Sequence, residues 1–386
     1  MARPWATGWL LAAALLAGCP GSPPPPEGAD PVGLLRGGEE TAGYARVTGP
    51  RPLRFPRDHG PHPAFRQEWW YWTGTLRAPD GRRYGFQLTF FRRALRPPGA
   101  PPRGSAWAAE QLWLVHGAVS DPGGDPEAGR FRPFRRLERQ ALGLAGGQAR
   151  PFRVWVRDWE ARSTGASLLP LRLRARDGGW GLDLVLTAGR GPFLQGRQGY
   201  SRKGEDPASA SLYYSLTRLL ARGELLIEGR RVPVEGLAWM DREWSSAALE
   251  PGQAGWDWTA LHLEDGSDLM LYRIRREGGG ADPRSAGLLV GPDGRPRVLA
   301  AGDFRMVPLG PPWRSPRTGI RYPLRWRLEL PGEGLVLELE PWLEGQELAF
   351  GLRYWEGAVS ARGRRGGRPV RGEGYLELVG YGPRGP

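Results

Sequence analysis

The chain has 386 residues, of which 40% are hydrophobic, and a formal net charge of +13. This length suits two domains, and the apolar content is sufficient to build their cores. Nearly all the positive charge is arginine, which mostly alternates with apolar residues as on the solvated face of a strand, so we exclude nucleic acid as a partner. The single cysteine excludes an internal disulfide.

The first 19 residues are predicted to be a lipoprotein signal peptide. Residues 9–17 form an apolar run of signal-peptide length that is too short to span a bilayer. The run leads into LAGC at 16–19, which resembles a lipobox and implies that Cys19 is acylated; an ordinary secretory signal with a chance cysteine is the alternative. We therefore expect an exported protein, lipid-anchored to a bacterial membrane and facing the periplasm. Pro20, in place of an aspartate, favours the outer membrane.

Residues 20–50 are predicted to be a tether. Their beginning, PGSPPPPEGADP, contains four consecutive prolines, which favour an extended polyproline conformation over helix or central strand. Downstream of it, no run is long and apolar enough to be a transmembrane helix.

The remaining chain is predicted to be all-β. Apolar and polar residues alternate with a period of two, as at residues 84–90, 171–175 and 324–330, and this is the pattern of antiparallel strands with one buried face. Turn signals such as Pro79-Asp80-Gly81 separate these segments. No long stretch has a helical period, so we expect barrels or sandwiches.

Two halves of the body resemble each other. WYWT at 70–73 and WDWT at 256–259 are each followed by a strand, an Asp-Gly turn and a second strand. The pairs at 213–214 and 354–355 each lead into a glycine-rich hairpin. This shared order predicts a duplication, with one domain at 51–248 and the other at 249–386. An opening strand to which the last hairpin returns predicts an antiparallel barrel that closes on itself.

Several motifs resemble the AttH / carotenoid 1,2-hydratase family. FPRDHGPH at 55–62 and EWWYWTG at 68–74 are similar to its N-terminal signature, GLAWMDREW at 236–244 to its central one, and GWDW at 255–258 and YWEG at 354–357 also fit. The resemblance implies two tandem lipocalin-like barrels. Members of the family include accessory lipoproteins linked to ABC-type exporters, hydratases of acyclic carotenoids, fungal cyclases and proteins described as secreted hydrolases. The hydratase pattern has a histidine where this chain has Asp257, which weakens the transfer of hydratase activity.

Glu68 is the first candidate catalytic residue. On a strand it shares one face with Trp70 and Trp72, while Trp69 and Tyr71 point to the other. A carboxyl group buried beside aromatic rings has a raised pKa unless a cation pairs with it. Glu68 is therefore either a general acid or one half of a buried Glu–Arg pair.

Asp241, Glu243 and Asp257 are the other candidate catalytic carboxylates. Asp241 and Glu243 share a strand face with Trp239 and have Arg242 opposite, an arrangement that suits acid–base work or an ion-pair network between the two barrels. Asp257 lies between two tryptophans but points away from them on a strand.

Aromatic residues of the same motifs are predicted to bind an apolar ligand or to fill the cores. These candidates are Trp70, Trp72, Trp239, Trp256, Trp258, Tyr213, Tyr354 and Trp355. His59 and His62 form an H-x-x-H pair in a loop, and His116 is distant in sequence, so no metal site is expected. No phosphate loop, dinucleotide motif or G-x-S-x-G elbow is present, and no cofactor is expected.

The sequence leaves two functions open. The first is a lipid-anchored carrier that holds a hydrophobic small molecule in the first barrel or between the two, with ABC transporter components as possible partners. The second is an enzyme, a hydratase or cyclase, in which one of the four carboxylic acids protonates a double bond and aromatic faces stabilise the resulting cation.

Overall fold

The computed structural model describes residues 41–382, except for 102, 106, 126–129, 248 and 351. Cys19, the predicted signal peptide and most of the predicted tether lie outside these residues. The end of the tether, 41–50, rests on the body, since the Ala45 backbone N–H donates to Ala64 at 2.8 Å and Val47 is buried in the first core. Within the described part of the chain, no helix is long and apolar enough to cross a membrane.

The predicted all-β fold is confirmed: the described residues form two large antiparallel sheets and one two-stranded hairpin, with three 3-10 helices of three residues each and no α-helix. The first sheet contains β1 (Gln67–Arg77), β2 (Arg83–Ala94), β3 (Gln111–Ser120), β4 (Phe131–Arg139), β5 (Ala145–Ala149), β6 (Phe152–Val156), β7 (Trp159–Ser163), β8 (Leu171–Asp177), β9 (Trp180–Leu186), β10 (Arg190–Leu194), β11 (Tyr200–Arg202), β12 (Ala210–Ile227) and β13 (Arg230–Ala247). The second contains β14 (Gln253–Leu263), β15 (Asp268–Arg276), β16 (Ala286–Val290), β17 (Pro296–Ala300), β18 (Arg305–Leu309), β21 (Arg325–Leu330), β22 (Leu335–Pro341), β23 (Glu347–Phe350), β24 (Leu352–Arg365) and β25 (Arg368–Val379). The hairpin pairs β19 (Trp313–Arg314) with β20 (Arg321–Tyr322), and the 3-10 helices are Arg57–His59, Ala301–Asp303 and Pro331–Glu333.

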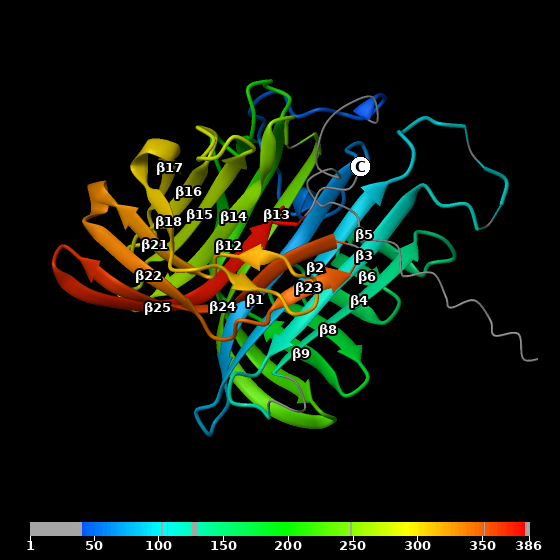
Figure 1. Cartoon of the computed structure of the whole chain (residues 1–386). Helices are drawn as coiled ribbons and strands as arrows, with labels where there is room; N and C mark the ends of the chain where they lie inside the picture. The colour runs from blue at the N-terminus through cyan, green and yellow to red at the C-terminus, as the bar shows by residue number, and fades with distance from the viewer. Residues whose placement is uncertain are drawn as a thin grey trace, which may run out of the picture.

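The two sheets have the same central topology. In the first, β1 lies between β2 and the returning strand β13; in the second, β14 lies between β15 and the returning strand β25. Figure 1 shows the first sheet in blue to green and the second in yellow-green to red, and β25 of the second sheet contacts β1 of the first. The predicted boundary at 248/249 falls in the connection between β13 and β14.

Both sheets curl like barrels, but hydrogen bonds do not close them. Among the described strands, the path of the first sheet ends at β4 and β5, and that of the second at β17 and β18. In the first sheet side-chain packing takes the place of the missing ladder: the Trp113 ring of β3 lies where a side chain at Gly147 of β5 would be. The expected complete closure is therefore replaced by a near-barrel and a more open half-barrel.

The two W-x-W-T motifs occupy equivalent strands but face opposite ways. Trp70 and Trp72 of β1 are fully buried in the core enclosed by the first sheet. Trp256 and Trp258 of β14 instead belong to a third apolar cluster, which lies between the two sheets. Because side chains alternate along a strand, a shift of one residue in phase is sufficient for this inversion. It gives the second sheet an aromatic outer face that packs against the first.

Candidate active site

A row of cross-strand neighbours on the first sheet faces the second sheet. Tyr71 of β1 pairs with Asp241 of β13 on one side and with Thr89 of β2 on the other. The row continues to Ser215 of β12 and to His116 of β3. Directly opposed residues in an antiparallel sheet point to the same side, so these polar groups from five strands gather on one surface.

A second row lies on the outer face of the second sheet. Glu377 of β25 is directly opposite Glu356 of β24 and, on its other side, Trp258 of β14, which in turn pairs with Tyr272 of β15. The rows meet where the Tyr71 ring packs edge-on against Trp258, with ring centroids 5.2 Å apart. The contacts of β1 with β25 and of β2 with β24 hold the two faces together.

A cavity of about 580 Å³ lies between these two faces. Its aromatic walls come from both sheets, with Trp69, Tyr71 and Tyr213 on one side and Trp256, Trp258 and Tyr354 on the other. Leu95 and Leu137 also line it and are 47% and 53% exposed, so they mark the end that opens to solvent. The volume and the mainly apolar lining suit a lipophilic molecule of moderate size.

Glu356 and Glu377 are the most unusual groups in this cavity. Glu356 is 1% exposed, and among the described residues neither of its carboxyl oxygens has a well-formed hydrogen-bond partner. Glu377 accepts a hydrogen bond from Trp256 Nε1 at 2.9 Å. Two carboxylates directly opposite each other on neighbouring strands cannot both be ionised without strong repulsion.

Burial and neighbouring carboxylates raise the pKa of both members of this pair. Burial is the main cause that raises the pKa of Glu377, to about 8, while the Trp256 hydrogen bond opposes the rise. The pKa of Glu356 is raised well above its ordinary value, first by burial and then by the neighbouring Glu377; the nearby Tyr71 hydroxyl offsets part of this rise. At neutral pH the cavity therefore contains un-ionised carboxylic acids that can donate protons.

Asp241 lies in a different environment on the facing row. It accepts hydrogen bonds from Tyr213 Oη at 2.5 Å and Trp239 Nε1 at 2.7 Å, and Ser215 Oγ also donates to it. Burial raises its pKa to about 6, and the three donors limit that rise. Asp241 is thus the more acidic carboxyl group, and it is ionised at neutral pH while Glu377 is not.

The comparison with known proteins decides the family. A model of the AttH-like family matches residues 46–381, which is most of the chain. The chain belongs to the AttH-like family. One similar structure is the crystal structure of a Nitrosomonas europaea protein that is described only provisionally as an AttH. The two sequences are 36% identical, and the structures superimpose with a TM-score of 0.74 over 88% of this chain and all of the Nitrosomonas chain.

Two curated relatives of this AttH-like protein are named as enzymes. Dehydratase asqC of Emericella nidulans is 25% identical over 51% of this chain and 57% of its own length. Kievitone hydratase of Fusarium solani subsp. phaseoli is 28% identical over 38% of this chain and 41% of its own. The chain therefore spans about half the length of these relatives. A kievitone hydratase structure from Nectria haematococca, 17% identical over 88% of this chain and 96% of its own with a TM-score of 0.66, shares the fold.

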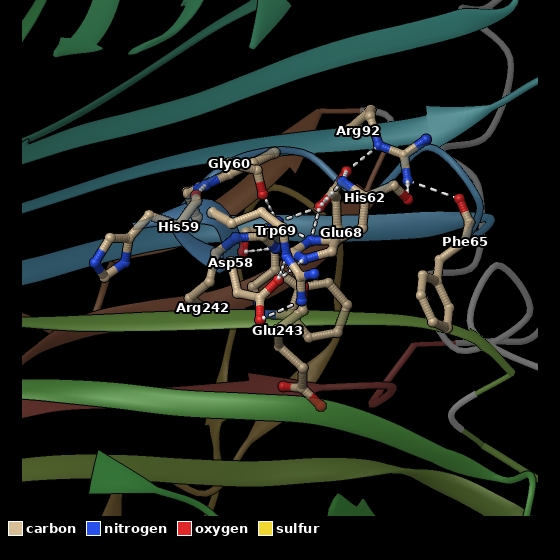
Figure 2. A network of polar contacts seen from close by, with 12 residues as sticks. Asp58, His59, Gly60, His62, Phe65, Glu68, Trp69, Arg92, Arg242 and Glu243 are labelled. Atoms are coloured by element: carbon tan, nitrogen blue, oxygen red, sulfur yellow. Dashed lines mark hydrogen bonds and ion pairs between the residues drawn. The ribbon is translucent and has the colours of Figure 1, made fainter. Parts of the chain in front are cut away.

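Glu68, the first candidate acid, forms a buried ion-pair network instead of a free carboxyl group. Arg92 Nε and Arg242 Nη2 both donate to it, and the His62 backbone N–H donates at 2.9 Å (Figure 2). Although burial alone would raise its pKa, the two guanidinium groups lower the pKa well below the ordinary value. Of the two roles considered for Glu68, the structure therefore matches the Glu–Arg pair.

The other predicted carboxylates are divided between the cavity and a core. Glu243 lines the cavity next to Asp241 and pairs with Lys203, at 3.4 Å between Nζ and Oε1. Asp257 is fully buried on the opposite face of β14, where Arg273 donates to it at 2.9 Å and Arg275 also pairs with it. Because side chains alternate along β14, Asp257 lies away from the cavity that its neighbours Trp256 and Trp258 line.

The predicted aromatic ligand-binding residues are divided in the same way. Trp256, Trp258, Tyr213 and Tyr354 line the cavity. Trp70 and Trp72 belong to the core of the first sheet and Trp355 to that of the second, while Trp239 packs in the cluster between the sheets and donates to Asp241.

The histidines have hydrogen-bond roles instead of forming a metal cluster. His62 lies between Asp58 and Glu68 and stacks on Trp244, and His59 Nδ1 is 2.6 Å from Tyr214 Oη. Within residues 41–382, apart from the undescribed gaps, no group of three or more suitable side chains could hold a metal ion.

Sequence reasoning missed Glu356, Glu377 and Lys203 as site residues. Glu356 lies within the YWEG motif at 354–357, and Lys203 is the only lysine in the chain, so both carried a signal. Glu377 carried none, because it becomes unusual only through the register that places it opposite Glu356.

Proposed function

We propose that this protein is an enzyme that adds water to, or removes it from, a carbon–carbon double bond of a lipophilic substrate bound between the two sheets. The observation that carries the proposal is the Glu356–Glu377 pair, two directly opposed carboxyl groups with raised pKa values in an aromatic cavity of about 580 Å³. A hydratase and a dehydratase among the relatives agree with it.

Glu377 is the proton donor in this proposal. Its pKa of about 8 leaves it protonated at neutral pH yet close enough to neutrality to release the proton, which is the balance that general acid catalysis needs. Trp256 donates a hydrogen bond to Glu377, whereas among the described residues no donor of similar geometry stabilises a charge on Glu356. Glu356 therefore stays protonated and can donate a hydrogen bond to the carboxylate that Glu377 becomes.

The reaction balances without a cofactor. The Glu377 proton forms a C–H bond at one carbon of the double bond, and the cation that develops at the other carbon faces the rings of Trp256 and Trp258. Water then forms the C–O bond, and the proton it loses returns to the Glu377 carboxylate. Dehydration follows the same steps in reverse.

Turnover in isotopically labelled water tests the proposal. Purified protein would be incubated in H₂¹⁸O with acyclic carotenoids, with kievitone and with lipids extracted from its own host, and the products analysed by mass spectrometry. We expect the wild type to add one labelled water to a substrate. The Glu377→Gln variant should still bind that substrate but should not add water to it. A bound molecule recovered unchanged under all conditions would instead support the carrier.

The location of the protein remains a separate proposal that rests on the N-terminal sequence. We propose that Cys19 is acylated and holds the exported body at a bacterial membrane, where lipophilic substrates are present. Labelling with radioactive palmitate in the native host, with Cys19→Ser as the control, should give a labelled band only for the wild type. An association with ABC-type exporter components stays a prediction.

A further inference from the structure

Lys203 is held at the cavity by both sheets. It is the only lysine in a chain that otherwise uses arginine for its strong bases. It follows β11, and its backbone N–H donates to Ser209 at 2.8 Å while its carbonyl accepts from Gln253 Nε2 at 2.7 Å. Gln253 begins the second sheet, so the position of Lys203 relative to the cavity is fixed from two sides.

The Lys203 ammonium group is buried and charged. Its Nζ lies 3.4 Å from Glu243 Oε1, 3.9 Å from the centre of the Tyr272 ring and 5.1 Å from that of Tyr213. Burial alone would lower its pKa, but Glu243 and Tyr272 outweigh this and raise it. The side chain is 10% exposed and lines the cavity, so its contacts leave it within reach of a bound molecule.

This cation lies at a distance from the proposed proton donor. In the second row, Tyr272 is two strands away from Glu377, with Trp258 between them. At the usual strand spacing this separation is about 10 Å. An ammonium group next to a developing carbocation would oppose its formation, whereas at this distance it can hold another part of the substrate.

We propose that Lys203 binds an acidic oxygen of the substrate, a carboxylate, phenolate or enolate, and so places a double bond at Glu377, two strands from Tyr272. The position of the double bond rests on the proposed function; the binding of the oxygen does not. A buried ion pair that served only packing could be replaced by apolar residues with little loss of stability, so the place of this pair in the cavity lining points to a ligand.

The other cations of the cavity are less suited to this role. Arg92 donates to Glu68 and to the backbone carbonyls of His62 and Phe65, which commits its guanidinium group. Arg135 lies over the Phe350 ring at 5.6 Å, and Arg93 Nη1 donates to Gln67 Oε1 at 3.5 Å. Lys203 is the cation that is next to both Tyr213 and Tyr272 on the walls of the cavity.

The binding of cis-parinaric acid and of its methyl ester tests this proposal. The two probes share a fluorescent hydrocarbon chain and differ only in the acidic oxygen, and energy transfer from the cavity tryptophans reports binding. At neutral pH we expect the wild type to bind the acid at least about tenfold more tightly than the ester. Lys203→Met should remove this preference, and Glu243→Gln, which frees the ammonium group from its partner, should increase it.

Equal affinity of the wild type for both probes would overturn the proposal, because no cation then binds the acidic oxygen. An unchanged preference in Lys203→Met would also overturn it and would assign the contact with the acidic oxygen to an arginine. The double variant Lys203→Met/Glu243→Gln removes the pair without leaving a buried charge, and its binding of the ester shows that the cavity is intact. Because neither probe has to react, the result is independent of whether Glu377→Gln abolishes turnover.

Discussion

Replacing Glu377 by glutamine should stabilise the protein at alkaline pH while it removes the proposed proton donor. Since burial is the main cause that raises the Glu377 pKa from 4.5 to about 8, with Asp241 and Glu243 adding to the rise, the folded protein retains a proton that the unfolded chain has lost across that window. The free energy of unfolding then falls as the pH rises, by about 1.4 kcal/mol per pH unit for each retained proton. Glutamine has nearly the same shape and cannot ionise, so this loss disappears.

The magnitude follows from the number of retained protons. With Glu356 also raised, the pair lowers the stability of the wild type by up to about 2.7 kcal/mol per pH unit within the window, and Glu377→Gln should halve that slope. Urea unfolding followed by tryptophan fluorescence at several pH values between about 5 and 8 measures it, and the difference between variant and wild type cancels the other titrating groups.

Glu338→Gln is the matched control, because Glu338 lies on the second sheet and its side chain is 62% exposed, so solvent screens its charge. Its stability should follow the wild type at every pH. If Glu377→Gln also parallels the wild type, or is less stable at pH near 8, then the pair is not held protonated and the mechanism built on it fails.

Three further predictions concern the polar groups around the site. Glu68→Gln leaves Arg92 and Arg242 buried without their shared partner and should lower the free energy of unfolding by about 3–5 kcal/mol, measured by urea denaturation; a loss below about 1 kcal/mol would contradict the network. Asp257→Asn should destabilise the second sheet by about 3 kcal/mol in the same assay, without changing probe binding in the cavity, and a selective loss of binding would contradict its core role. Burial lowers the pKa of His116 to about 3, so below pH 6.5 the unfolded chain binds a proton that the folded protein does not. The free energy of unfolding should therefore fall by about 1.4 kcal/mol for each pH unit below 6.5. This fall should be shallower in His116→Gln, and an unchanged slope would contradict the prediction.

The sequence predicted the elements that depend on local pattern. Alternation with a period of two correctly separated Trp70 and Trp72, which lie in the core of the first sheet, from Trp69 and Tyr71, which line the cavity. It also placed Asp241 and Glu243 on the face opposite Arg242, which lies over the Trp70 ring. The buried Glu–Arg pair was one of the two interpretations of Glu68, because an acid among aromatic side chains needs a cation and the chain is rich in arginine.

What the sequence could not show is which face encloses the cavity and which strands are neighbours. The tryptophans of β1 and those of β14 look equivalent as motifs, yet one pair fills a barrel core and the other lines the cavity. The Glu356–Glu377 pair depends on a register between two strands, and Asp241 meets Tyr71 only through the pairing of the first strand with the thirteenth. Such contacts are set by the folded topology, so no local pattern contains them.

The most direct test of a protonated acid in the cavity is infrared spectroscopy of the protein at neutral pH. The C=O stretching band of an un-ionised carboxylic acid, well separated from that of a carboxylate, reports the protonation state without any substrate. The account predicts such a band in the wild type, weaker in Glu377→Gln and absent in Glu356→Gln/Glu377→Gln. A wild-type spectrum that contains carboxylate bands alone would contradict it.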